Sequence, residues 1–215
     1  PLHLLYLLKS LKLSLVNTKD ALSLSRGKAA EDIWRLLEFD KRVIERWSIN
    51  FLKSVDDLCD NCVTMAKEKV GRSSKIKLKT LSNGLWWMHE VSKTGIPPPT
   101  VTIPIKKTGF YNMDELITIK QVETEISVAS SGISLPKIMR MYLSNGKKHT
   151  MLLKSGTDDL RQDAIMEQVF DKVNLLFQKD NECLKRKLRV RTYKGIPLGF
   201  GTGVIEFVDN SIPLN

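Results

Sequence analysis

The stretch HTMLLKSGTDDLRQD, residues 149–163, decides the fold. Residues 149–153 form a short run that is typical of a strand, and Lys154 closes it. Ser, Gly and Thr at 155–157 then make a polar loop. Asp158 or Asp159 can accept the first free amide hydrogens of a following helix as its N-cap. The stretch therefore predicts a strand, a short loop and a helix with an acidic first turn.

A helical period follows the loop and continues to Gln178. Apolar residues recur there at three- and four-residue steps, which places them on one side of a helix. The main stripe is Ile165, Val169, Val173 and Leu176, and Met166, Phe170 and Phe177 lie beside it.

Lys154 and Asp163 are the candidate catalytic pair. Phosphoryl transfer needs a cation on the nucleotide phosphates and an anion that holds this cation in place, and in kinases a strand lysine and a helix carboxylate supply them. Lys154 ends a strand, and Asp163 lies in the first turns of the next helix. We therefore expect the two side chains to meet across the short loop.

The rest of the second half predicts an antiparallel sheet, so the chain as a whole is of the α+β class. Short β-branched or alternating runs are separated by turns, above all Ser144–Lys147 with its Asn-Gly pair, which is typical of a hairpin. The predicted strands are 101–105, 116–119, 122–128, 138–143, 149–153, 188–193 and 203–208.

The first half predicts helices. Three- and four-residue steps from Ile44 to Met65 predict one long amphipathic helix over about 41–69, ended by the glycine and polar turn at 71–74. Leu4–Val16 and Ala29–Phe39 also have helical spacing. The proline triplet at 97–99 cannot continue a helix, so we place the boundary between the halves there. We expect the long helix to be scaffold, packed through Trp47, Phe51, Val55 and Leu58.

Composition narrows the classes of function. Lys and Arg outnumber Asp and Glu by 34 to 24, for a formal charge of +10, which favours anionic partners such as nucleotides or nucleic acid. The short basic clusters at 75–79 and 185–191 are interpreted as solvated faces. Cys59 and Cys62 have metal-ligand spacing but no second pair, so no metal site is predicted. No apolar run approaches the roughly 20 residues of a membrane span, so no membrane partner is predicted.

Several motifs resemble those of the phosphoinositide 3-kinases and their protein-kinase relatives. Lys154, the loop and Asp-Asp-Leu-Arg-Gln-Asp match the signature shared by both groups. Residues 131–138, SGISLPKI, occupy the place of the phosphate-covering loop, and Leu-Pro-Lys-Ile is similar to the ATM type. Residues 192–198, TYKGIPL, with 203–208, GVIEFV, resemble the strand and hinge that hold adenine. This combination favours the ATM branch of the phosphatidylinositol 3-kinase-related protein kinases over the lipid kinases.

The resemblance implies a domain organisation. Residues 1–96 are then the end of the helical FAT region and a linker, with the best local match at 54–60, and residues 97–215 are the kinase N-lobe up to the hinge. Phe207 stands where the ATM branch usually has tryptophan, and one extra residue separates Lys154 from Asp163, which suits a fungal member. We interpret the chain as a piece of a longer polypeptide that lacks the catalytic loop and is inactive alone.

The resemblance also implies ligands and roles. ATP would be the bound nucleotide, with Mg²⁺ held by residues of the following C-lobe, and Lys154 and Asp163 would be catalytic. Leu135 and Pro136 would roof the adenine, Leu152 and Tyr193 would form the inner wall, and Ile205–Val208 would be the hinge. The full set of implied nucleotide-binding residues is Ser131, Gly132, Leu135, Pro136, Leu152, Lys154, Tyr193, Ile205, Glu206, Phe207 and Val208.

The implied function is that of a large serine/threonine kinase that modifies Ser/Thr-Gln sites in DNA-damage signalling and telomere maintenance. Its implied partners are such protein substrates, a DNA-break sensor complex of the MRN/MRX type and a second copy of itself, in the nucleus. Three alternatives stay open at this point: a phosphoinositide kinase, a non-catalytic pseudokinase scaffold of the same family, and a basic helical protein that binds nucleic acid.

Overall fold

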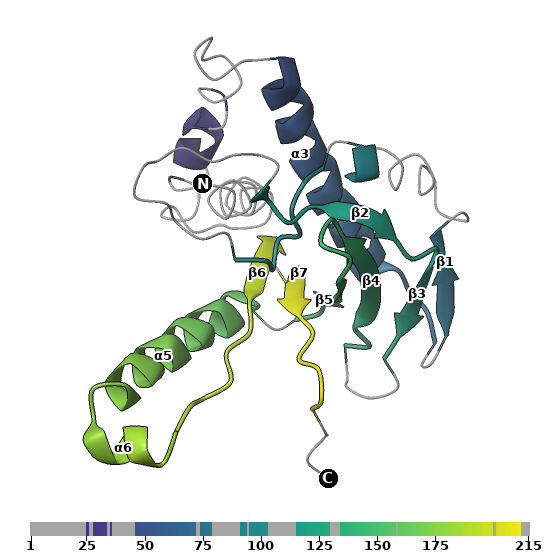
Figure 1. Cartoon of the computed structure of the whole chain (residues 1–215). Helices are drawn as coiled ribbons and strands as arrows, with labels where there is room; N and C mark the ends of the chain where they lie inside the picture. The colour runs from purple at the N-terminus through teal and green to yellow at the C-terminus, as the bar shows by residue number, and fades with distance from the viewer. Residues whose placement is uncertain are drawn as a thin grey trace.

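The computed structural model describes residues 25, 28–33, 35, 46–71, 74–78, 91–93, 95–102, 115–129, 134–157, 159–199 and 201–211. Within these residues a seven-stranded sheet forms one layer, and helix α3 (Arg46–Lys67) lies against it. Helices α5 (Arg161–Phe177) and α6 (Asn181–Lys185) extend away from the sheet as an arm (Figure 1). The α+β class that the sequence predicted is confirmed.

The sheet is antiparallel, in the order β1-β3-β4-β5-β7-β6, and β2 also pairs with β4. Because α5 and α6 are inserted between β5 and β6 in the chain, they leave the sheet from its β5–β7–β6 side. The strands are β1 (Lys75–Lys77), β2 (Ile119–Val122), β3 (Glu125–Val128), β4 (Lys137–Leu143), β5 (Lys148–Ser155), β6 (Gly195–Gly199) and β7 (Thr202–Glu206).

Strands β2 and β3 lie one after the other along the same edge of β4. Val122 of β2 is opposite Met141, and Ser127 of β3 is opposite Ile138. Between them, the Glu123 amide still donates to the Arg140 carbonyl at 2.9 Å. The strand predicted at 122–128 is therefore present but interrupted at residues 123 and 124.

The turn between β4 and β5 is the hairpin that Asn-Gly predicted. Gly146 has φ 75°, a backbone conformation that favours glycine. The Leu143 amide donates to the Lys147 carbonyl at 2.9 Å, and the Asn145 side chain accepts from the Lys147 amide at 3.0 Å. This turn fixes the register of the two longest strands.

The core lies between α3 and one face of the sheet. Alternate residues of β4 and β5 are fully buried, among them Met139, Met141, Met151 and Leu153. Each such side chain contributes about 1.5–3 kcal/mol of hydrophobic stabilisation. From α3 the same core receives Val55, Leu58, Cys59, Cys62, Met65 and Ala66.

The helical predictions are confirmed where the structure describes them. Helix α3 ends at Lys67, two residues before the predicted end. Val55 and Leu58 are buried as expected, and Phe51 is half-buried against the core. Residues 28–33 and 35 are helical, whereas Leu4–Val16 and the Trp47 side chain lie outside the description. No helix in the described ranges combines the length and apolar character that a membrane span needs.

The strand predicted at 188–193 is wrong. The chain is irregular there, and the strand lies at β6 instead. The Asn174 side chain explains the difference: its amide donates to the Val190 carbonyl at 2.9 Å, and its oxygen accepts from the Val190 amide at 2.8 Å. Both backbone groups of Val190 are therefore bound to α5 and cannot join a ladder. Residues 101 and 102 of the predicted strand 101–105 are also not extended in a strand, and its remainder lies outside the description.

Strand β1 lies before the boundary placed at residue 97. Lys75 and Lys77 point to solvent while Ile76 is buried, so the basic cluster at 75–79 is in part an edge strand. Lys75 Nζ contacts the Glu125 carboxylate at 3.0 Å across to β3. The sheet therefore begins within the first half of the chain, and the division into 1–96 and 97–215 stays a prediction.

Candidate functional site

The sheet face opposite α3 carries a row of apolar side chains. Ile138 is paired with Leu152, and Leu152 is paired with Ile205, so the three side chains cross β4, β5 and β7 on one face. All three are half-buried, whereas their neighbours Met139, Leu153 and Val204 point into the core. This row is a partly exposed apolar strip across three neighbouring strands.

Lys154 lies two residues after Leu152 and therefore on the same face. Its Nζ is 3.5 Å from Oδ2 of Asp163 on α5, and the side chains are 26% and 31% exposed. The contact that the chain order predicted is therefore present. The cation and the carboxylate meet beside the apolar row, and both side chains are partly exposed to solvent. Their roles in nucleotide binding stay predictions.

The loop between β5 and α5 holds this pair in place. The Gly156 amide donates to the Gly201 carbonyl at 2.8 Å. A Cβ at Gly201 would lie 2.1 Å from the Gly156 carbonyl oxygen, so only glycine fits this contact. Leu160, which is 3% exposed, anchors the start of α5 in the protein interior.

An aspartate accepts a hydrogen bond from the first turn of α5, but it is not the N-cap residue. The N-cap is Leu160, and Asp159 just before it accepts from the Arg161 amide at 3.0 Å. The Arg161 guanidinium also contacts Asp159 at 2.6 Å, and this hydrogen bond lowers the pKa of the Asp159 carboxyl. Asp158, the other predicted cap, lies outside the description.

The segment predicted to roof the site joins β3 to β4. The Ala129 amide donates to the Pro136 carbonyl at 2.9 Å and closes this connection. Leu135 has φ 42°, a left-handed conformation that is rare for leucine, and it packs against the core. Next to it, Lys137 Nζ donates to the Ala66 carbonyl in the last turn of α3 at 2.6 Å. Ser131 and Gly132 lie outside the described residues.

The predicted hinge, Ile205–Val208, begins in the last two residues of β7 and continues past its end. The Phe207 amide donates to the Thr150 carbonyl at 3.1 Å, which keeps the chain beside β5. The Val208 amide donates to no backbone carbonyl of the described residues. Glu206, Phe207 and Val208 are all half-buried. Tyr193 is half-buried as well, and burial followed by the charges of Asp163 and Glu167 raises the pKa of its hydroxyl.

Two charged residues at this place were not predicted. Glu167 lies four residues after Asp163 and thus on the same side of α5, and its carboxylate forms an ion pair with Lys194 Nζ. The side chains are 8% and 26% exposed, so this pair is more buried than Lys154–Asp163. The four-residue spacing of the two acids was visible in the sequence, but their basic partners are distant in the chain.

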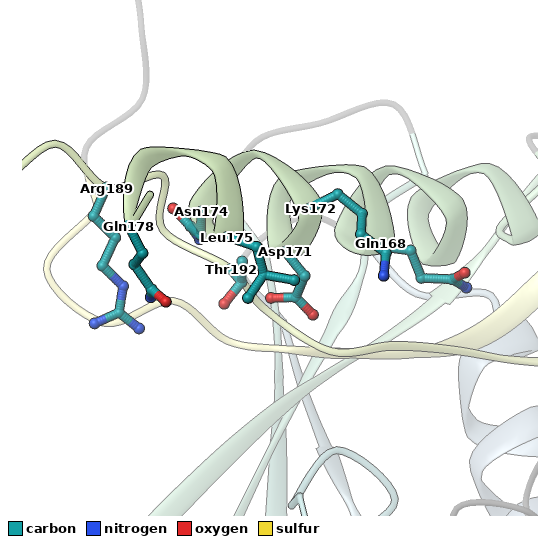
Figure 2. A pocket seen from close by; sticks show the side chains of 8 residues that line it. All are labelled: Gln168, Asp171, Lys172, Asn174, Leu175, Gln178, Arg189 and Thr192. Atoms are coloured by element: carbon teal, nitrogen blue, oxygen red, sulfur yellow. The ribbon is translucent and has the colours of Figure 1, made fainter. Parts of the chain in front are cut away.

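The structure also has a hollow on the arm, away from Lys154. It measures about 660 Å³ and lies between α5 and the returning segment 189–192 (Figure 2). Its lining is mostly polar: Gln168, Asp171, Lys172, Asn174, Leu175, Gln178, Arg189 and Thr192. Within the part of the chain that the structure describes, no group of three His, Cys, Asp or Glu side chains is placed to hold a metal ion.

Comparison with known proteins points to one family. The sequence profile described as phosphatidylinositol 3- and 4-kinase matches residues 149–215. The serine/threonine-protein kinase TEL1 of Debaryomyces hansenii is 45% identical over 100% of this chain. The TEL1 kinase of Candida albicans is 46% identical over 99% of this chain. The chain spans 7% of the length of each of these relatives.

Solved structures agree with the sequence comparison. The open conformation of CtTel1 superposes with a TM-score of 0.84 at 33% identity, over 98% of this chain and 8% of that one. The FAT and kinase domain of CtTel1 gives a TM-score of 0.81 at 31% identity, over 98% of this chain and 14% of that one. The chain therefore belongs to the phosphatidylinositol 3-kinase-related protein kinases, in the branch of the fungal Tel1 kinases, the orthologues of ATM.

Proposed function

We propose that this chain forms the ATP-binding part of a serine/threonine protein kinase. The observation that carries the proposal is the pair Lys154–Asp163 beside the apolar row Ile138, Leu152 and Ile205. An apolar surface beside a few polar anchors is what a purine base with a phosphate chain requires. The names of the relatives, serine/threonine-protein kinase TEL1, support the same reaction.

The proposed arrangement assigns a task to each part. The base lies against Leu152 and Ile205, beneath Leu135 and Pro136, with Phe207 against its face and Tyr193 at the inner wall. The Val208 amide donates to the base. Lys154 binds the α- and β-phosphates, and Asp163 orients Lys154. Mg²⁺ would neutralise phosphate charge when bound, and we assign its ligands to the C-lobe.

The protein substrate and its setting are part of the proposal. We infer that the full-length kinase phosphorylates Ser/Thr-Gln sites in DNA-damage signalling and telomere maintenance, in the nucleus, and responds to a DNA-break sensor complex of the MRN/MRX type. A homodimer is also proposed, because one solved CtTel1 structure is described as a complete dimer with C2 symmetry.

The test is made in the full-length protein that carries this segment. Lys154→Met should lower kcat on a Ser-Gln peptide by about 100-fold or more, because charge on the transferred phosphoryl group loses its main cation. Asp163→Asn should have a milder effect, since the lysine remains but is less well oriented.

The matched control is Lys185→Met, because Lys185 is 73% exposed on the arm and pairs with Glu182, itself 72% exposed. It should leave turnover unchanged. Near-normal turnover in Lys154→Met would contradict the assignment. Phosphorylation of phosphatidylinositol vesicles in place of the peptide would favour the lipid-kinase alternative, and absence of both activities in the parent protein would favour the pseudokinase.

A further inference from the structure

Helix α5 carries two carboxylates on its sheet-facing side, and each has its own lysine. Asp163 contacts Lys154 at the end of β5. Glu167 contacts Lys194, which immediately precedes β6. The two ion pairs therefore fix two successive turns of α5 to two different strands. With both contacts made, the helix cannot rotate about its axis without breaking one of them.

Lys194 is also bound to the last residue of β7 through its backbone. The Lys194 amide donates to the Glu206 carboxylate at 3.1 Å, and the Glu206 amide donates to the Lys194 carbonyl at 2.7 Å. Glu206 belongs to the predicted hinge. Lys194 thus connects α5, through its side chain, to the adenine end of the proposed site, through its backbone.

Gly195, the residue after Lys194, lies beside the first turn of α5. A Cβ at Gly195 would lie 3.6 Å from the Asp163 Cβ and 3.6 Å from the Ala164 amide nitrogen. The chain after Lys194 therefore runs directly against the first turn of α5. A change in the Glu167–Lys194 contact would therefore act close to Asp163 in the structure.

The apolar side of α5 does not supply this orientation. Of the stripe that the helical period predicted, Ile165, Val169 and Leu176 are 58%, 44% and 64% exposed, and Val173 is half-buried. In contrast, Glu167 is the one residue of α5 that is buried. The orientation of α5 on the described sheet is thus set by charged contacts more than by apolar packing.

We propose that Glu167 and Lys194 are positioning residues of the kinase, which hold α5 so that Asp163 meets Lys154 and which link that helix to the hinge. The proposal rests on the proposed function, because it concerns the geometry of the same site. We assign no direct contact with the nucleotide to Glu167 or Lys194. They act through Asp163 and through the backbone of Lys194.

The experiment measures kcat and the KM for ATP of full-length variants. Glu167→Gln and Lys194→Met should each lower kcat by about 10- to 100-fold, the range expected when a catalytic group is misplaced by about 1 Å. The KM for ATP should change by less than about threefold, since the groups that bind the base remain. Glu167→Gln combined with Lys194→Gln tests the pair without leaving one buried charge alone.

A thermodynamic cycle separates positioning from folding. If Glu167 acts through Asp163, the kcat loss from Glu167→Gln should disappear in the Asp163→Asn background. A purely structural role predicts instead that the two losses multiply, and that kcat follows the fraction of folded protein. Exchange of the charges, Glu167→Lys with Lys194→Glu, should recover part of the kcat lost in either single charge reversal.

The control pair is Glu182–Lys185 on α6, whose side chains are 72% and 73% exposed. Glu182→Gln should leave kcat and KM unchanged. Normal kcat in Glu167→Gln together with an inactive Lys154→Met would overturn this inference alone. An active Lys154→Met would overturn the proposed function instead, so the two failures are distinct. Multiplicative losses in the cycle would also overturn the positioning role.

Discussion

The sheet with α3 buries its large apolar side chains, whereas the arm of residues 161–193 exposes many of its own. In the sheet layer Met139, Met151 and Leu153 are fully buried against α3. Of the ten large apolar residues that are exposed in the described ranges, seven lie on the arm. They are Ile165, Met166, Val169, Leu175, Leu176, Leu184 and Leu188.

This difference bears on how the site is built. Lys154 belongs to the sheet, whose position is fixed by a close-packed core. Asp163 belongs to α5, which meets the sheet through Asp163–Lys154, Glu167–Lys194 and the buried Leu160 at its start. The candidate site therefore combines a rigid part with a helix whose placement depends on a few contacts, two of them ion pairs. Changes in α5 should alter activity before they alter the stability of the sheet.

The largest expected effect contrasts one leucine from each region. Leu58→Ala should lower the free energy of unfolding by about 2–5 kcal/mol, because Leu58 is fully buried between α3 and the sheet. Leu176→Ala, at a residue that is 64% exposed on the arm, should change it by less than about 0.5 kcal/mol. Denaturant unfolding of the two variants measures both values. Equal losses would show that the arm is buried as deeply as the sheet layer.

A smaller effect is the dependence of stability on pH near neutrality, which we expect to arise in the sheet at His149 and not on the arm. Burial lowers the pKa of His149, in β5, below its ordinary value of 6.5, while the charge of Asp209 opposes the shift. The unfolded chain then binds the proton more readily than the folded one, so the stability contribution is complete above pH 6.5 and is lost as the pH falls below it.

The measurement for this prediction is the melting temperature between pH 7.5 and 5.5. It should fall toward pH 5.5, and His149→Gln should reduce that fall while leaving the contact to Thr100 available to the amide. His149 Nε2 lies 2.7 Å from the Thr100 hydroxyl. An unchanged slope in His149→Gln would show that the acid sensitivity arises elsewhere.

Short-range patterns predicted the parts of the structure that depend on neighbours in sequence. The Asn-Gly turn set the β4–β5 hairpin, and the order of strand, loop and acidic helix brought Lys154 to Asp163. The predicted helical period of α5 was also correct. Such a period shows which residues share one side of a helix, but not whether another element covers that side. In the described structure Ile165, Val169 and Leu176 of the predicted stripe are exposed, and Val173 is half-buried.

Long-range contacts account for what the sequence did not predict. Asn174 takes up both backbone groups of Val190, so the alternating run at 188–193 forms no strand. Strand β1 exists because Ile76 pairs with Ile126, fifty residues later in the chain. The contact of Glu167 with Lys194 likewise joins residues that no local pattern relates.

The central claim, that Lys154 is the cation of a phosphate site, can be measured directly by acylation. An acyl-phosphate derivative of ATP transfers its acyl group to a lysine amine that lies beside the bound phosphates, with release of the nucleotide. Mass spectrometry of the labelled full-length protein should find the acyl group on Lys154, and excess ATP should prevent the labelling. Labelling of the exposed Lys185 should be weak and unaffected by ATP. Absence of label on Lys154, or label that excess ATP does not reduce, would contradict the account.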